Sequence, residues 1–276
     1  MAQLFDRFIQ ERKYLANVSP HTIEWHRQSL RWLRVERPDA ADLRNVVLRM
    51  REAGLRASSV NCYLGSINAY LKWSGSPLRV PKLRQESYVP AVYSAQQIAL
   101  LVRWKPTGFY QRRLHALVLT FLDTGTRLDE VLSLSVVNCD LDNLLITVTG
   151  KGRKQRIIPF SVELRRTLAK FIMDAGLRPE QLIFGTMGRA RKLSQRNTLR
   201  DVKALCTRLG FTAPGRAIHA FRHTFAVNYL RRGGSVFHLQ KVLGHSSLEM
   251  TRRYANLVTE DLQAVHERVS LLSQRP

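Results

Sequence analysis

The chain has 276 residues, 45% of them hydrophobic, which is long enough for two domains with separate cores. No apolar run reaches the ~18–20 residues that a membrane span needs, and the N-terminus lacks the pattern of a secretion signal, which favours a cytoplasmic protein without a membrane partner. Lys and Arg number 44 against 21 Asp and Glu, and the net charge of +23 predicts a polyanionic partner such as nucleic acid.

Both halves of the chain share the positive charge. There are 15 basic and 8 acidic residues up to Glu86, and 29 basic and 13 acidic residues after it. This distribution is expected if both halves contact the same duplex. A basic surface that only keeps the protein in solution, or the codon bias of an arginine-rich genome, is the alternative explanation, and the charge alone does not separate them.

The first ~85 residues predict four short amphipathic helices. Ser19 followed by Pro20 is typical of a helix start, Gly54 of a helix end, and Ser58 or Ser59 is expected to cap the fourth helix. The core positions at helical spacing are Phe5, Phe8, Ile9, Ile23, His26, Leu30, Leu33, Leu43, Val46, Val47, Met50, Val60, Tyr63, Leu64, Ile67, Tyr70 and Leu71. We therefore expect residues 1–84 to form a compact helical bundle with arginines on its outer faces.

A change in composition follows this bundle. Residues 74–92 contain three prolines and predict an extended linker. Helical structure is expected to resume at Ser94, where Ser-Ala-Gln-Gln fits a capping box, and a helix that includes the apolar stretch His115–Phe121 is expected to end near Gly125. The second domain is expected to span residues 85–276.

One stretch of the second domain predicts a β-hairpin. Leu144–Thr149 is rich in β-branched and aliphatic residues, residues 150–154 form a basic turn with two glycines, and the chain returns at Arg156–Pro159. Helices are expected again from Val162. The predicted fold class is mainly α with a small antiparallel β-sheet.

The three cysteines, Cys62, Cys139 and Cys206, are far apart and form no CxxC pair. They predict no metal site, and we expect them to be buried free thiols in a reducing compartment.

Five residues could hold a phosphate, although each has an ordinary explanation when taken alone. Arg127 stands at a glycine turn before a helix, where a surface ion pair is the commoner role, and Lys151 lies at the tip of the hairpin. His219 and Arg222 are three residues apart and so share one helix face, as a buried histidine beside an arginine also would. His245 ends one helix in Leu-Gly-His-Ser-Ser.

A tyrosine stands nine residues after that histidine. Tyr254 follows Thr-Arg-Arg, and a lone tyrosine near the end of a chain is normally a packing residue.

The joint pattern is far more specific than its parts. Arg127, Lys151, His219, Arg222, His245 and Tyr254 stand in the order and spacing of the tyrosine recombinase (phage integrase) family, which this chain resembles, and the intervals resemble those of the bacterial Xer recombinases. The matching motifs are Thr-Gly-Thr-Arg-Leu-Asp-Glu, Gly-Lys-Gly-Arg-Lys-Gln-Arg, His-Ala-Phe-Arg-His-Thr-Phe-Ala, and Leu-Gly-His-Ser-Ser followed by Thr-Arg-Arg-Tyr. The resemblance is strong over residues 85–265 and weaker over the N-terminal bundle.

The resemblance implies a DNA strand transferase in which Tyr254 attacks a backbone phosphate and forms a 3′-phosphotyrosine bond. Arg127 and Arg222 suit the two non-bridging oxygens, because each presents a forked pair of N–H groups, and His245 is expected to donate another hydrogen bond. No cofactor, metal or ATP is expected, since the bond energy is kept in the ester.

Several assignments stay open at this point. Lys151 is the expected acid for the leaving 5′ oxygen, and Lys154 is its rival. His219 either binds the phosphate or helps to accept the tyrosine proton. Glu130 either orients an arginine or is an ordinary surface carboxylate. The tail, residues 261–269, docks either on a neighbouring protomer or on its own domain.

The resemblance also implies an architecture and partners. Residues 1–84 would be a core-binding (SAM-like) DNA-binding domain and residues 85–276 a catalytic domain with a C-terminal helix, together forming a C-shaped clamp on DNA. Expected partners are double-stranded recombination sites, further copies of the chain in a homo-tetramer on two sites, and accessory DNA-bending proteins. Strand exchange through a Holliday junction would serve integration, excision or dimer resolution.

Two other functions compete with recombination. A type IB topoisomerase would use the same chemistry but would relax DNA without site preference, and the small size of the chain argues against it. A DNA-binding protein without catalysis is disfavoured because all six catalytic positions are filled.

Overall fold

A computed structural model describes residues 5–85, 89–150, 154–186, 189–245 and 247–255, together with the single residues 266 and 270. The chain divides into two compact units, Met1–Tyr88 and Val89–Pro276, and each unit has its own hydrophobic core. The division expected from the sequence falls after residue 84. None of the helices in the described ranges combines the length and the apolar character needed to cross a bilayer.

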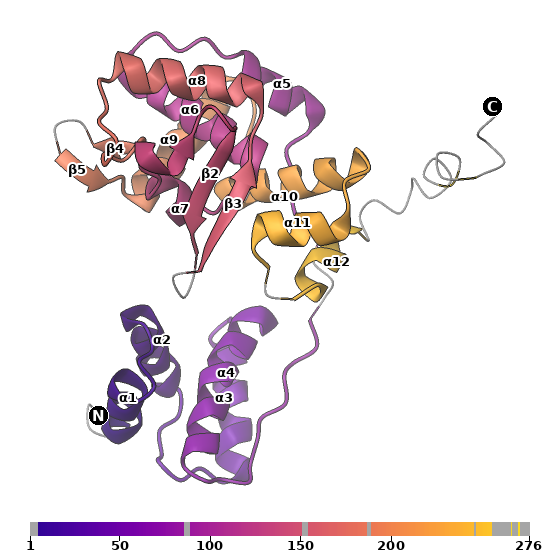
Figure 1. Cartoon of the computed structure of the whole chain (residues 1–276). Helices are drawn as coiled ribbons and strands as arrows, with labels where there is room; N and C mark the ends of the chain where they lie inside the picture. The colour runs from indigo at the N-terminus through magenta and orange to yellow at the C-terminus, as the bar shows by residue number, and fades with distance from the viewer. Residues whose placement is uncertain are drawn as a thin grey trace. The chain divides into compact units, whose positions relative to one another are not determined.

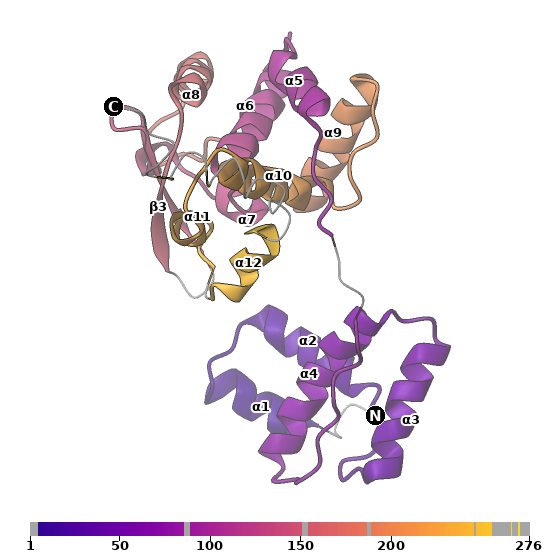
Figure 2. The ribbon, with the colours of Figure 1, turned by 90° about the vertical axis from the view of Figure 1, so that its right-hand side faces the viewer.

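The first unit is a helical bundle, as predicted (Figures 1 and 2). Its helices are α1 (Asp6–Tyr14), α2 (Pro20–Leu30), α3 (Ala40–Glu52) and α4 (Ala57–Trp73). Helix α4 packs against α2 and α3. The large side chains between these helices are almost fully buried, and they include Phe8, Leu30, Met50, Leu64 and Ile67.

A side-chain cap explains where α2 begins but not where α4 begins. The Ser19 hydroxyl accepts a hydrogen bond from the amide of Thr22 at the start of α2, as its place before a proline predicted. The prediction that Ser58 or Ser59 caps the fourth helix is wrong. Helix α4 begins at Ala57 after Arg56, and the amide of Ser59 already donates to the Arg56 carbonyl, so both serines lie within its first turn.

The segment after α4 is extended, but it is bound to the bundle instead of being a free linker. The side-chain amide of Asn68 donates to the carbonyl of Val80 and accepts from its amide, each at 2.9 Å. Asn61 makes the same pair of bonds to Leu83 at 2.8 Å. The two asparagine side chains therefore supply the hydrogen bonds that a neighbouring strand would otherwise give to the backbone of this segment.

The second unit contains the remaining elements. Its helices are α5 (Ala95–Arg103), α6 (Phe109–Thr124), α7 (Leu128–Leu132), the 3₁₀ helix η1 (Val136–Asn138), α8 (Val162–Asp174), α9 (Gln195–Arg208), α10 (Ala217–Arg231), α11 (Val236–Leu243) and α12 (Glu249–Ala255). The capping box predicted at Ser94 is present at the start of α5. The predicted end of a helix at Gly125 is also correct, since α6 ends there.

The strands of this unit are β1 (Cys139–Asp140), β2 (Leu145–Thr149), β3 (Gln155–Pro159), β4 (Gly185–Thr186) and β5 (Arg189–Lys192). Strands β1, β2 and β3 form an antiparallel sheet in which Ile146 lies opposite Ile158, so the hairpin predicted from the sequence is confirmed. Strands β4 and β5 pair separately. These additional strands, like β1, are too short to show an alternating pattern.

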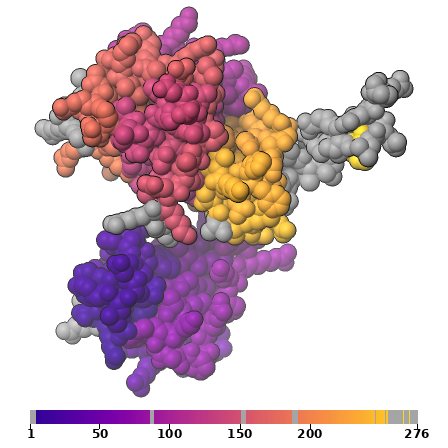
Figure 3. All heavy atoms as spheres, in the orientation of Figure 1, coloured from indigo at the N-terminus to yellow at the C-terminus, as the bar shows by residue number. Residues whose placement is uncertain are grey.

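Two buried clusters position the ends of the helices in this unit. In the larger one, Phe221 of α10 stacks on Phe121 of α6 and on Tyr93, with ring centroids 5.7 and 4.4 Å apart. The smaller cluster joins α10, α11 and α12 and contains Leu243 and Tyr254. Figure 3 shows these last helices, in orange and yellow, packed directly beside the β2–β3 hairpin.

The cysteines depart from expectation at one position. Cys139 and Cys206 are buried free thiols, as predicted, whereas Cys62 is free but exposed because it lies on the solvent-facing side of α4. The docking of the tail, residues 261–269, concerns positions that lie outside the described residues except for His266.

Candidate active site

Two helices of the second unit end on glycine where the predicted site residues meet. Gly125 ends α6 with φ of +60°, and Gly244 ends α11 with φ of +64°. A Cβ at Gly125 would lie 2.4 Å from a ring carbon of Phe225, and one at Gly244 would lie 3.0 Å from Cδ of Arg156. Glycine is therefore needed for both conformation and space. The last carbonyls of each helix lack helical partners and form the negative end of its dipole.

Arg222 of α10 bridges these two helix ends. It is 6% exposed, and its Nη1 donates to the carbonyl of Gly125 at 2.9 Å while its Nη2 donates to that of Leu243 at 2.7 Å. These bonds use two of the five N–H groups of its guanidinium. Burial, followed by the charge of Arg127, lowers the pKa of Arg222 to about 10, so the guanidinium remains charged at neutral pH.

Glu130 of α7 orients two arginines. Its side chain is 3% exposed, and its Oε1 accepts from Nη1 of Arg127 at 2.9 Å and from Nη1 of Arg156 at 2.7 Å. Its Oε2 accepts from Nη2 of Arg156 and from the amide of Arg127. Burial alone would raise the pKa of Glu130, but these hydrogen bonds lower it to about 2. The hypothesis of an orienting carboxylate is therefore correct, and the hypothesis of an ordinary surface residue is wrong.

The cluster holds three guanidinium groups around one carboxylate. Arg156 also donates from Nε to the carbonyl of Val242 at 2.7 Å, and Arg127 donates from Nη2 to that of Gly244 at 3.3 Å. The side chain of Arg127 is 37% exposed, so it faces outward from the more deeply buried pair. Because positive charge exceeds negative charge in this cluster, an anion such as a phosphate is the complementary ligand.

His245 follows the glycine that ends α11. Its Nδ1 lies 2.9 Å from Oγ1 of Thr251, which is fully buried. Desolvation and the charges of Arg222 and Arg127 lower the pKa of His245 to about 4, so the imidazole is neutral at pH 7. If Thr251 donates its hydroxyl hydrogen to Nδ1, the ring hydrogen lies on Nε2 and is free to bind an acceptor.

Tyr254 of α12 packs beside this histidine and is 5% exposed. Its ring lies 6.3 Å from the His245 imidazole, and the two planes differ by 13°. Its hydroxyl lies 2.8 Å from Nδ1 of His223 on α10. Tyr254 partly offsets the lowering of the Arg222 pKa that burial and Arg127 cause, so the phenol lies within electrostatic reach of the arginine cluster.

Of the remaining predicted residues, the structure describes His219 and Lys154 but not Lys151. His219 lies one helical turn before Arg222 and is exposed, and desolvation together with the charges of Arg216 and Arg222 lowers its pKa. Lys151 lies outside the described residues, and Lys154 is exposed at the base of the hairpin turn. The preference for Lys151 over Lys154 as the acid therefore stays a prediction.

Two residues of the site were missed in the sequence. Arg156 stands two residues before the buried Ile158 on β3, and the period of two along a strand places both side chains on the inner face of the hairpin. His223 stands four residues after His219, and this spacing places both on one face of α10. Both signals were present in the sequence, although neither residue belongs to the six family positions.

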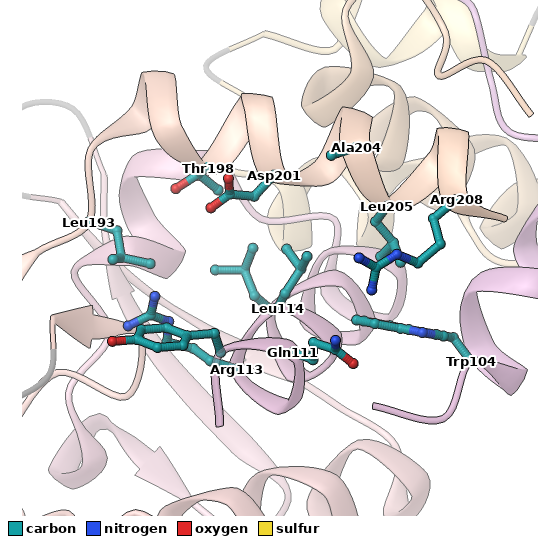
Figure 4. Close-up of a pocket in the computed structure, with 12 residues that line it drawn as sticks. Trp104, Gln111, Arg113, Leu114, Leu193, Thr198, Asp201, Ala204, Leu205 and Arg208 are labelled. Atoms are coloured by element: carbon teal, nitrogen blue, oxygen red, sulfur yellow. The ribbon is translucent and has the colours of Figure 1, made fainter. Parts of the chain in front are cut away.

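A separate pocket of about 330 Å³ lies between α6 and α9 (Figure 4). Leu114, Leu117 and Leu205 contribute apolar lining, and Arg113 and Asp201 contribute polar lining. None of the five family positions that the structure describes lines it. Within the described ranges, no three His, Cys, Asp or Glu side chains gather into a candidate metal site.

Comparison with protein families matches residues 92–260 to the phage integrase family. The chain is 30% identical to the tyrosine recombinase XerC of Xanthomonas campestris pv. campestris (strain B100), over 94% of this chain and 86% of that protein. It is 27% identical to the tyrosine recombinase XerD of Chlorobaculum tepidum, over 93% of this chain and 91% of the relative.

Solved structures share the fold at lower identity. The Tn1549 transposon integrase in complex with transposon right-end DNA aligns with a TM-score of 0.77 and 20% identity, over 97% of this chain and 98% of that one. The XerH site-specific recombinase in a post-cleavage complex with its palindromic difH substrate aligns with a TM-score of 0.73 and 17% identity, over 99% of this chain and 85% of that one. The chain therefore belongs to the phage integrase family, with the tyrosine recombinases XerC and XerD among its relatives.

Proposed function

We propose that this tyrosine recombinase cleaves and rejoins DNA at specific sites through a 3′-phosphotyrosine bond to Tyr254. One observation carries the proposal: Arg127, Arg222, His245 and Tyr254 come from separate elements and meet around the same two helix ends. The relatives named as tyrosine recombinases support it, as does the post-cleavage DNA complex of XerH.

The arginine cluster is suited to the charge that develops during cleavage. Arg127 and Arg222 each keep N–H groups for a non-bridging oxygen, and their other donors are already held by Glu130 and by main-chain carbonyls. Fixed donors of this kind need no reorganisation as the phosphoryl group gains charge. His245 supplies a further donor from Nε2 in the tautomer in which Thr251 donates its hydroxyl hydrogen to Nδ1.

The bond changes balance without an external energy source. The Tyr254 oxygen forms a bond to phosphorus while the bond from phosphorus to the 5′ oxygen breaks. Lys151, with Lys154 as its rival, gives a proton to the departing oxygen. The phosphodiester energy is kept in the phosphotyrosine, so rejoining by the reverse attack requires no ATP, metal or cofactor.

The first unit is proposed to bind the DNA duplex as a core-binding domain of residues 1–84. A hollow of about 450 Å³ on this unit is lined by Arg31, Arg34 and Arg49 together with Trp32 and Tyr63. Arginines around a shallow hollow bind backbone phosphates without reading bases. The catalytic domain of residues 85–276 is proposed to bind the same duplex.

The assembly and location belong to the same proposal. Four copies on two recombination sites would exchange strands in pairs through a Holliday junction, aided by accessory DNA-bending proteins, in the cytoplasm. Integration, excision and dimer resolution all use these steps, and the DNA sites that are joined determine which of them results.

A suicide-substrate assay tests the function. Nicked duplexes carrying candidate sites trap the covalent complex, because the strand that should rejoin diffuses away. We expect trapped protein whose DNA adduct maps by mass spectrometry to Tyr254, and no adduct with Tyr254→Phe, which keeps the ring but not the nucleophile. A trapped adduct that persists in Tyr254→Phe contradicts the proposal, and relaxation of DNA without site preference would instead favour a topoisomerase.

A further inference from the structure

The hydroxyl of Tyr254 has a hydrogen-bond partner that none of the six family positions accounts for. Nδ1 of His223 lies 2.8 Å from the phenolic oxygen, and the two rings are 5.6 Å apart. His219, the histidine expected to help with the tyrosine proton, makes no hydrogen bond to Tyr254 in the described part of the chain. Among the described residues, the basic nitrogen that is hydrogen-bonded to the nucleophile belongs to His223, the neighbour of Arg222.

We propose that Nδ1 of His223 accepts the hydroxyl proton of Tyr254 as this residue attacks the scissile phosphate, and returns it when the strand is rejoined. The inference rests on the proposed function, since it concerns the same nucleophile. During cleavage the proton moves from the phenol to His223, the Tyr254 oxygen bonds to phosphorus, and the 5′ oxygen leaves with a proton from Lys151. By microscopic reversibility, His223 then acts as an acid during rejoining.

The position of His223 fits this role. It lies on α10 between Arg222, which is held by two carbonyls, and the buried Thr224, so the helix fixes its backbone. The phenol is 5% exposed and packs in the cluster of α10, α11 and α12, which limits access of bulk water as an alternative base. The neighbouring guanidinium of Arg222 cannot accept the proton at neutral pH. The imidazole of His223 can.

Bound DNA would strengthen this base. Without DNA, desolvation and then the charges of His219, Arg222 and Arg216 lower the pKa of His223 to about 4, and His245 and Tyr254 are the titratable groups facing it from the neighbouring segments. The imidazole is therefore neutral at pH 7 and has a lone pair to offer. A phosphate held by the arginines offsets their repulsion and raises the basicity of His223, so bound substrate favours the proton transfer.

Two substitutions separate proton transfer from positioning. His223→Ala removes the ring, whereas His223→Asn places an amide near Nδ1 that can bind the hydroxyl but cannot take its proton. In single-turnover cleavage of a nicked substrate at pH 7, we expect both variants to be slower by about 10²–10⁴-fold. Their rates should rise by about tenfold per pH unit toward the phenol pKa, because phenolate then forms without a base. Added imidazole should restore part of the rate of His223→Ala but not of His223→Asn.

A modified substrate shows at which end of the reaction His223 acts. A sulfur in place of the bridging 5′ oxygen leaves without needing a proton, so it should rescue Lys151→Ala but neither His223 variant. DNA affinity and the thermal midpoint of each variant are measured alongside, and His223→Asn serves if His223→Ala does not fold. A parent-like rate in His223→Asn, or variant pH profiles parallel to the parent's, overturns the inference. If the unchanged protein forms no Tyr254 adduct, the proposed function fails as well.

Discussion

The arginines of the two units are the same residue type in opposite surroundings. On the N-terminal unit, Arg27, Arg31 and Arg34 are exposed and none of them forms an ion pair with a described carboxylate. In the C-terminal unit, Arg222 and Arg156 are largely buried and held at fixed distances by carbonyls and by Glu130. Exposed charge attracts DNA over a distance, whereas buried and oriented charge stabilises one arrangement of atoms.

Two histidines, one in each unit, also share a property in different surroundings. His26 in the bundle and His223 in the catalytic unit both have a pKa lowered to about 4, first by desolvation. Nδ1 of His26 bonds to the hydroxyl of Ser66 within a closed apolar core, whereas Nδ1 of His223 meets a phenol beside an arginine cluster. A lowered pKa therefore does not identify a site, and the partner atom does.

The largest expected difference between the units is in the cleavage rate. Arg222→Ala should slow single-turnover cleavage by about 10³-fold, because a fixed donor to the phosphoryl group is lost. Arg31→Ala should change the rate less than about twofold at saturating DNA while lowering the slope of log affinity against log salt by about 1. Equal rate losses in the two variants would remove the distinction, and thermal midpoints check that both proteins fold.

The next difference concerns stability against acid. A pKa of Glu130 lowered from 4.5 to about 2 makes on the order of 3 kcal/mol of stability available above pH 4.5, which is lost as the pH falls toward 2. Arg156→Met should destabilise the protein by about 3 kcal/mol at pH 7, because the buried carboxylate loses a partner. It should also move the acid transition to higher pH in urea unfolding.

Arg165→Met is the matched control for this measurement. Arg165 pairs with Asp142 at 3.7 Å, and both side chains are exposed, so the change should stay within about 0.5 kcal/mol. Identical urea midpoints for Arg156→Met and Arg165→Met would contradict the account of Glu130.

The smallest effect is expected in the bundle. Ser66→Ala leaves Nδ1 of the buried His26 without its partner and should destabilise the N-terminal unit by about 1 kcal/mol, with cleavage at saturating DNA unchanged. Tryptophan fluorescence can follow this transition, because Trp25, Trp32 and Trp73 lie in that unit and only Trp104 lies in the other. A slower cleavage rate in Ser66→Ala would mean that the bundle influences the chemistry.

Much of the fold and most of the site were predictable from local patterns. Helical spacing, the Ser94 capping box and the β2–β3 hairpin follow from neighbouring residues, and four of the six family positions, Arg127, Arg222, His245 and Tyr254, meet in the described structure. The docking of residues 76–85 by Asn61 and Asn68 was not predictable, because it depends on hydrogen bonds between distant segments. The same holds for the pairing of His223 with Tyr254 across 31 residues.

The acceptors that hold Arg222 are main-chain oxygens at positions 125 and 243. A side-chain substitution cannot remove a backbone carbonyl oxygen. A mutation can therefore disturb these two acceptors only by changing the geometry of a helix end. Substitutions of the exposed arginines on the N-terminal unit should therefore leave this anchor of Arg222 intact, whereas a side chain at Gly125 or Gly244 should disturb it.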